Sequence, residues 1–250
     1  MREQVEAVQR MQDYIESHLR EEITLEALAK VAGYVPEHAC RLFSRYVGLS
    51  PFEYVRARRL SRAALELRDA RKRVLDVALD YAFGSHEGFT RAFSSEFGIS
   101  PRRYRETTPP IRLFQPRSAY LEYLRDHKGA EPMENVQTVF TQVIKRPARK
   151  FIVQRGRKAT VYMEYCEELG CDVWGVLQSL KGALYEPIGA WLPEKLRTPG
   201  TSQYVQGVEV PLDYNGPIPE GMEIIHMEPC HMMVFQGHLP TAGWGLMLAS

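Results

Sequence analysis

The chain has 250 residues, of which 25% are charged and 44% belong to the hydrophobic set, and its formal net charge is +1. This composition is typical of a soluble protein with one large or two modest domains, and it excludes a disordered chain, a collagen and a disulfide-rich miniprotein. No apolar run approaches the roughly 18 residues that a membrane span needs. The charged, amphipathic start lacks the apolar core of a signal peptide. We therefore expect a cytoplasmic protein without membrane contact.

The charge is unevenly distributed. Residues 1–128 contain 22 Lys and Arg against 18 Asp and Glu, whereas residues 129–250 contain 10 against 13. A basic half joined to an acidic half suggests that only one end meets a polyanion, although an arginine-rich solvated helix face gives the same balance. The four cysteines have no zinc-ligand spacing and no nucleophile motif appears, so we expect no metal, no cofactor, no catalytic residues and no enzyme activity.

The first 105 or so residues have helical periodicity. Thr24 is a good N-cap for a helix that Gly33 and Tyr34 end. Pro36 suits the first turn of a helix over 36–47, which Gly48 ends. This second helix buries Ala39, Leu42, Phe43 and either Tyr46 or Val47, and it exposes Glu37, His38, Cys40, Arg41, Ser44 and Arg45. Ser50 and Glu53 then form a capping box for a further helix.

The helical half is a tandem duplication. A shift of 50 residues aligns RLFSRYVGLSPFEY (41–54) with RAFSSEFGISPRRY (91–104), and seven of the 14 positions are identical. The second copy repeats the plan of the first, with Ser85 as the N-cap of a helix over 86–97. We call the helices over 36–47 and 86–97 the reading helices. Two short helices joined by a tight turn form a helix-turn-helix; a plain αα-hairpin is the alternative, but the polar, arginine-bearing second helix favours DNA recognition.

The composition changes after the helical half. Pro109, Pro110 and Pro116 mark a connector over 109–134, in which SAYLEYLRDH forms a short helix. Short β-rich runs follow at 136–144, 150–155, 203–210, 223–227 and 231–236, and the stretches 159–169 and 172–180 look helical. We therefore predict an α+β domain over 135–250.

The motifs of the first half resemble a known family. G-Y-x-P-x-H-x-x-R-x-F and F-G-S-x-x-x-F-x-R-A-F-x-x-x-F-G-x-S-P-x-x-Y-R are similar to the DNA-binding domain of AraC/XylS transcription regulators. The resemblance covers about residues 5–108. It implies an all-α domain, residues 1–108, whose two helix-turn-helix units are joined by a long helix from Pro51 to about Leu67.

The second half resembles GyrI-like effector-binding domains, in which two β-α-β-β repeats form an aromatic pocket for small hydrophobic or cationic molecules. An AraC-type domain followed by a GyrI-like domain is the architecture of the Rob type of regulator. The last 13 residues, HLPTAGWGLMLAS, do not resemble the helix that the family has there. We therefore expect the second repeat to be incomplete and ligand binding to be weak or absent, unless a second chain covers the exposed face.

The resemblance also implies the sites. Base-reading positions correspond to Glu37, Cys40 and Arg41 in the first reading helix and to His86, Glu87, Thr90 and Arg91 in the second, with Arg45 on the same exposed face as Arg41. Arg102 and Arg103 open the last helix and suit phosphate contact. An ion pair within the domain is the alternative for Arg41 and Arg91. Val35 stands where the family usually has a capping Ser or Thr, and the cluster Arg56–Arg73 is interpreted as a solvated helix face.

The aromatic residues of the second half are the candidates for ligand contact, through area burial and cation–π attraction: Tyr162, Tyr165, Trp174, Trp191 and Tyr204. Ordinary core packing is the alternative for each. The predicted function is a transcription regulator that binds an asymmetric double-stranded DNA site, responds to a small-molecule effector and contacts RNA polymerase. The alternative is a GyrI-like hydrolase or sequestering protein with an attached DNA-binding domain.

Overall fold

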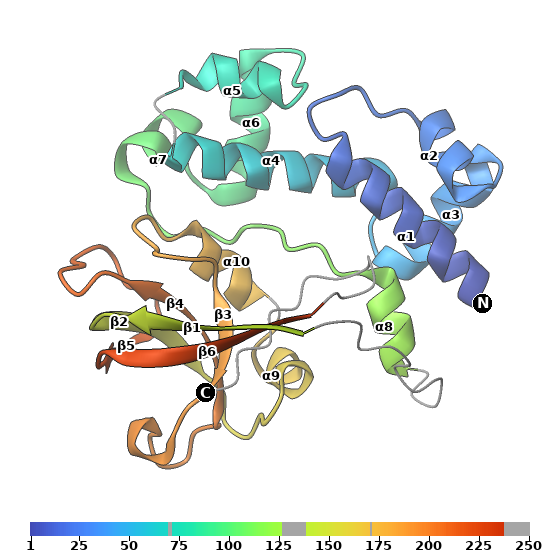
Figure 1. The fold of residues 1–250 in the computed structure, drawn as a ribbon. Coiled ribbons are helices and arrows are strands. Elements are labelled where there is room, and N and C mark those ends of the chain that lie inside the picture. Colours follow the sequence, from blue (N-terminus) through green and yellow to red (C-terminus); the bar gives the residue numbers. More distant parts are fainter. Residues whose placement is uncertain (70–71, 127–138, 171, 238–250) are drawn as a thin grey trace. The chain divides into compact units, whose positions relative to one another are not determined.

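The computed structural model describes residues 1–69, 72–126, 139–170 and 172–237, which form two compact units (Figure 1). In the described part, the first unit comprises Met1–Arg105 and the segment 116–126. The second comprises Glu106–Gln115 and the residues from 139 to 237. The segment 109–134, which the sequence presents as a connector, is thus divided between the units in its described part.

The first unit is all-helical, as predicted. Its helices are α1 (Arg2–Ser17), α2 (Leu25–Ala32), α3 (Pro36–Val47), α4 (Pro51–Asp69), α5 (Val74–Asp80), α6 (His86–Phe97), α7 (Pro101–Thr107) and α8 (Ala119–Asp126). α4 runs from the α2–α3 pair to the α5–α6 pair and is the predicted joining helix, although it continues to Asp69 (Figure 1).

The duplication is visible in the core of the first unit. Phe43 and Tyr54 are fully buried, with ring centroids 5.4 Å apart. Phe93 and Tyr104, which occupy the equivalent positions of the second copy, are also fully buried and lie 5.7 Å apart. The same aromatic pair therefore fixes each reading helix to the helix that follows it, because burial of large rings dominates core energetics.

The capping box that the sequence predicts is present in the first copy and is halved in the second. Ser50 Oγ accepts from Glu53 N at 3.3 Å, and Glu53 Oε2 accepts from Ser50 N at 2.8 Å. Hydrogen bonding of the Glu53 carboxylate to the Ser50 side chain, and then to the Ser50 backbone N–H, lowers the pKa of Glu53. In the second copy Ser100 Oγ accepts from Arg103 N at 3.3 Å, but an arginine stands where the glutamate would return the bond.

The two described parts of the connector dock on different units. Gln12 of α1 is buried, donates to Arg117 O at 2.7 Å and accepts from Ala119 N at 3.1 Å, so α8 belongs to the first unit. Ile111 N donates to Ser179 Oγ at 3.0 Å, so the segment Glu106–Gln115 belongs to the second unit. Residues 127–134 lie outside the described residues.

The second unit is α+β, as predicted. Its strands are β1 (Val139–Arg146), β2 (Arg149–Arg155), β3 (Ile188–Trp191), β4 (Tyr204–Val210), β5 (Glu223–Met227) and β6 (Cys230–Gly237). The helices α9 (Tyr162–Leu169) and α10 (Asp172–Ser179) and the short 3₁₀ helix η1 (Glu194–Leu196) connect them. All pairings are antiparallel, in a four-stranded sheet of order β3-β4-β2-β5 and a two-stranded sheet β1-β6.

The four-stranded sheet is covered on both faces. Ile152 and Val208 belong to the cluster that contains residues of α9 and α10, whereas Val153 and Val205 belong to a cluster on the opposite face. Every residue of β4 is therefore buried. The first repeat runs β2-α9-α10-β3-β4, with two short helices where the resemblance implies one. The expected incompleteness of the second repeat concerns residues 238–250, which lie outside the described residues.

Candidate nucleic-acid interface

The first helix-turn-helix has the turn that its sequence predicts. α2 ends at Gly33, whose φ of 77° is left-handed and whose N–H donates to Ala29 O at 2.9 Å. Glycine adopts this conformation without steric cost. α3 then begins after Val35, which has extended backbone angles but offers no side-chain cap. The first reading helix therefore starts with an uncapped turn, as the departure at Val35 suggested.

The second helix-turn-helix makes the turn differently. α5 already ends at Asp80, and Ala82 takes the left-handed conformation with φ 56°. This conformation costs a residue with a Cβ about 1–2 kcal/mol. Ser85 compensates at the start of α6, because its side chain accepts from Gly88 N at 3.0 Å. The two copies thus differ in the residue that makes the turn and in the capping of the reading helix.

Both reading helices bury one face and expose the opposite one. The buried residues are Ala39, Leu42 and Phe43 in α3, and Phe89, Ala92 and Phe93 in α6. The exposed predicted residues are Glu37, Arg41, Arg45, His86, Glu87 and Arg91. Cys40 and Thr90 are half-buried, and the Thr90 hydroxyl oxygen is buried, so the accessible part of Thr90 is not its hydroxyl.

Arg41 and Arg91 occupy equivalent positions of the two copies, and both are exposed. Within the described residues neither guanidinium forms an ion pair, and the glutamates one turn earlier, Glu37 and Glu87, are likewise without one. The alternative of an ion pair within the domain is therefore not seen there. A free guanidinium presents two parallel donors, which match the O6 and N7 acceptors of guanine.

Arg45, Arg102 and Arg103 are also exposed. The Arg45 guanidinium lies 5.6 Å from the centre of the Tyr46 ring, within cation–π range, so its position is restrained. Arg102 and Arg103 lie in the first turn of α7. The sequence gives α7 the same Ser-Pro start as α4, and Tyr104 of α7 packs on Phe93 of α6.

The interpretation of the cluster Arg56–Arg73 as a solvated face is wrong for its central members. Arg58 is buried and forms a two-pronged ion pair with Glu16 of α1. Arg59 donates to Leu19 O at 2.9 Å and to Glu21 O at 2.5 Å. These arginines fix α4 to α1 and to the loop after it. Arg58 lies on the buried stripe of α4 between Tyr54 and Ser61, a spacing that could have revealed its burial.

In the second unit, three of the five candidate aromatic residues come together. Tyr165 and Tyr204 lie in the core with ring centroids 5.5 Å apart, and Trp191 lies 5.2 Å from Tyr204. Burial raises the pKa of Tyr204 to about 12 and also raises the pKa of Tyr165. Trp191 is 42% exposed and donates from Nε1 to Thr160 O at 2.7 Å.

Tyr162 is exposed and Trp174 is half-buried. For Tyr165 and Tyr204 the core packing that the sequence left as an alternative is what the structure shows. Among the five candidates, the most accessible aromatic rings are therefore Trp191 and Tyr162 rather than the two buried tyrosines.

Two further findings restrict the chemistry. Across the described ranges, His, Cys, Asp and Glu side chains nowhere gather in groups of three that could hold a metal ion. Each helix in the same ranges is too short or too polar to cross a bilayer.

The comparisons with known proteins concern the first unit. A family model described as "Helix-turn-helix domain" matches residues 28–107. The Right origin-binding protein of Escherichia coli (strain K12) is 39% identical over 108 residues, which are 40% of this chain and 37% of that protein. The HTH-type transcriptional activator AarP of Providencia stuartii is 39% identical over 92 residues, which are 37% of this chain and 68% of that protein.

The Transposon Tn10 TetD protein of Escherichia coli is 41% identical over 92 residues and is matched over 67% of its length. The shared segment thus makes up most of the two short relatives but only about a third of the Right origin-binding protein. The segment that the family model matches, residues 28–107, contains both reading helices.

Proposed function

Because the chain belongs to the AraC family of helix-turn-helix transcription regulators, we propose that it regulates transcription by binding an asymmetric double-stranded DNA site as a single chain. The observation that carries this proposal is the exposure of Arg41 and Arg91 at equivalent positions of two reading helices in one chain. Two helices that enter successive major-groove segments are about one helical turn apart, ~10 base pairs. The expected site therefore covers roughly 20 base pairs with two different halves.

The test is selection of binding sites from random duplex DNA with the purified full chain, followed by footprinting of the selected sequence. We expect one asymmetric site that a monomer protects, with the stoichiometry measured by sedimentation. A perfect palindrome that only a dimer occupies would reject single-chain binding. Failure to select any sequence above random DNA would reject sequence-specific binding altogether.

We also propose that the second unit is the effector-binding part of the regulator, which acts in the cytoplasm and contacts RNA polymerase, without enzymatic activity. The accessible Trp191 ring, which packs edge-to-face with the buried Tyr204, supports this role because an aromatic face suits an apolar or cationic ligand. Titration of tryptophan fluorescence with a hydrophobic cation tests it, with Trp191→Phe compared with Trp174→Phe. A quench that Trp191→Phe leaves unchanged would contradict the assignment.

A further inference from the structure

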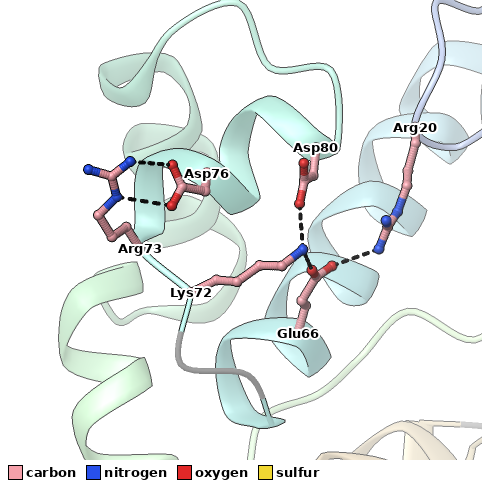
Figure 2. A network of polar contacts seen from close by, with 6 residues as sticks. All are labelled: Arg20, Glu66, Lys72, Arg73, Asp76 and Asp80. Atoms are coloured by element: carbon pink, nitrogen blue, oxygen red, sulfur yellow. Dashed lines mark hydrogen bonds and ion pairs between the residues drawn. The ribbon is translucent and has the colours of Figure 1, made fainter.

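Four charged side chains form a continuous chain of contacts from the end of α1 to the end of α5 (Figure 2). Arg20, which follows α1, pairs with Glu66 of α4 at 2.9 Å. Glu66 also pairs with Lys72, which lies between α4 and α5. Lys72 in turn pairs with Asp80, the last residue of α5, at 2.8 Å. We call these four residues the ionic joint.

The ionic joint differs from isolated surface pairs, which are individually worth little. Glu66 is largely shielded from solvent, with 11% of its side chain exposed, and it accepts from cations on both sides. The Arg20 guanidinium also lies 5.2 Å from the ring centre of Tyr81, the residue that ends α5. These contacts raise the pKa of Arg20, with the Tyr81 hydroxyl as the largest cause and Glu66 as a further one.

The backbone of Lys72 has a further partner. Arg105 of α7 donates from Nη1 to Lys72 O at 3.1 Å. The hydrogen bonds to Asp80 and Glu66 raise the pKa of Lys72. The position of Lys72, and with it the start of α5, is therefore determined by partners from α4, α5 and α7.

These contacts connect elements of the two copies of the duplication. Arg20 precedes the first helix-turn-helix, whereas Asp80 and Tyr81 belong to the second. α5 packs on α6, so the placement of α5 sets the placement of the second reading helix. α4 spans the distance between the two copies (Figure 1).

We propose that the ionic joint is a positioning element that sets the separation and angle of the two reading helices, and thereby the half-site spacing that the protein accepts. The inference rests on the proposed function, since it concerns how the chain reads a two-part DNA site. No joint residue needs to contact DNA for this role. An element that contributed only to stability would leave the spacing preference unchanged.

The experiment compares the selected site with versions that have one base pair inserted or deleted between the halves. One base pair rotates one half-site by ~34° relative to the other. We expect wild type to lose ~tenfold or more in affinity for the altered spacing, comparable to the loss of base contacts. For Asp80→Asn and Glu66→Gln we expect the ratio of the affinities for the selected and the altered spacing to fall to about threefold or less.

Asp76, which lies in α5 like Asp80, offers a matched control. Asp76 pairs with Arg73 at 3.0 Å, and this pair lies beside the joint without connecting the two copies (Figure 2). Asp76→Asn changes the charge and the side chain just as Asp80→Asn does, so it should keep the wild-type ratio. The loss of a negative charge can raise the affinity for all DNA. This general gain cancels in the ratio of affinities, because both spacings are measured for each variant.

Lys72→Met provides an additional variant, because the lysine side chain is 43% exposed and its replacement should leave the domain folded. If Asp80→Asn and Lys72→Met kept the wild-type ratio of affinities for the two spacings, the inference would be overturned and the proposed function would stand. Equal relaxation in Asp76→Asn would also overturn it. If the wild-type chain selected no DNA site, the proposed function and this inference would fall together.

Discussion

Arg58 of α4 and Glu16 of α1 form a two-pronged ion pair, with N–O distances of 2.5 and 2.7 Å, although the arginine side chain is only 6% exposed. Removal of one partner from a buried pair leaves an uncompensated charge and costs about 3–5 kcal/mol. Glu16 retains some solvent access, so for Arg58→Ala we expect a loss at the lower end, about 3 kcal/mol in the free energy of unfolding, measured by urea denaturation.

Arg62 offers a control for this prediction on the same helix. Its guanidinium lies 3.9 Å from Glu16 Oε2, but its side chain is 45% exposed. Exposed pairs contribute about 0–1 kcal/mol, so Arg62→Ala should change stability little. Equal losses for the two variants would show that burial does not determine the value of Arg58.

The unequal starts of the reading helices predict opposite effects of equivalent substitutions. Ser85→Ala removes the cap of α6 and should destabilise by about 1 kcal/mol. Val35→Ser supplies the missing cap of α3 and should stabilise by up to about 1 kcal/mol, since Val35 is mostly exposed and buries little apolar surface. Thermal unfolding of both variants measures the shifts. Destabilisation by Val35→Ser would contradict the assignment of an uncapped helix start.

The exposed arginines of the reading helices predict a loss of sequence preference. Arg41→Ala or Arg91→Ala should cost about 1–3 kcal/mol on the selected site and relax preference at one base pair. Arg103→Ala should weaken binding to specific and random DNA alike and reduce the salt dependence, because phosphate contacts carry no sequence information. Binding measured at several salt concentrations separates the two classes.

Arg157→Ala is the control for these variants, since its side chain is exposed on the second unit and the charge change is the same. It should leave both the affinity and the salt slope close to wild type. A loss for Arg41→Ala that is equal on selected and random DNA would assign Arg41 to the phosphate backbone instead.

The buried tyrosines predict an alkaline limit of stability. Burial raises the pKa of Tyr104 and Tyr204 to about 12 and also raises the pKa of Tyr54 and Tyr165. Below the unfolded pKa of about 10 these residues are neutral in both states, so their contribution is fully present. As the pH rises from about 10 towards 12, the unfolded chain releases protons that the folded chain retains, and stability falls.

Tyrosinate absorbance and circular dichroism, followed together through this pH range, test the prediction. We expect one class of tyrosines to ionise near pH 10 and a second class to ionise only as the structure is lost. Tyr204→Phe should remove one residue from the late class. Ionisation of every tyrosine near pH 10 in an intact fold would contradict it.

Local sequence signals were sufficient to predict the helices of the helix-turn-helix units. The capping residues Thr24 and Ser85 predicted helix starts, and the repeat predicted that Phe43 and Phe93 have equivalent environments. β3 was not predicted, because Ile188–Trp191 is short and contains a glycine and an alanine rather than alternating β-branched residues. Its strand conformation depends on pairing with β4.

Interactions between distant residues could not be predicted in the same way. The spacing along α4 indicates that Arg58 is buried, but its partner Glu16 lies 42 positions earlier and no local pattern specifies it. Tyr165 and Tyr204 looked like ligand contacts because the sequence does not say which face of a helix or strand an aromatic residue occupies. The exposure of Arg41 and Arg91 was easier to predict, because both copies of the duplicated motif keep an arginine on the polar face of the helix.

On the asymmetric site that we propose, the difference between the two copies gives the bound protein a direction. α3 begins Pro-Glu-His-Ala-Cys-Arg and α6 begins His-Glu-Gly-Phe-Thr-Arg, so the two ends of the DNA-binding surface are not interchangeable. A symmetric dimer on a palindrome looks the same from upstream and downstream, whereas a single chain with two unlike helices can lie on its site in only one orientation. Inverting the site within a promoter would therefore turn the whole protein around without weakening its binding.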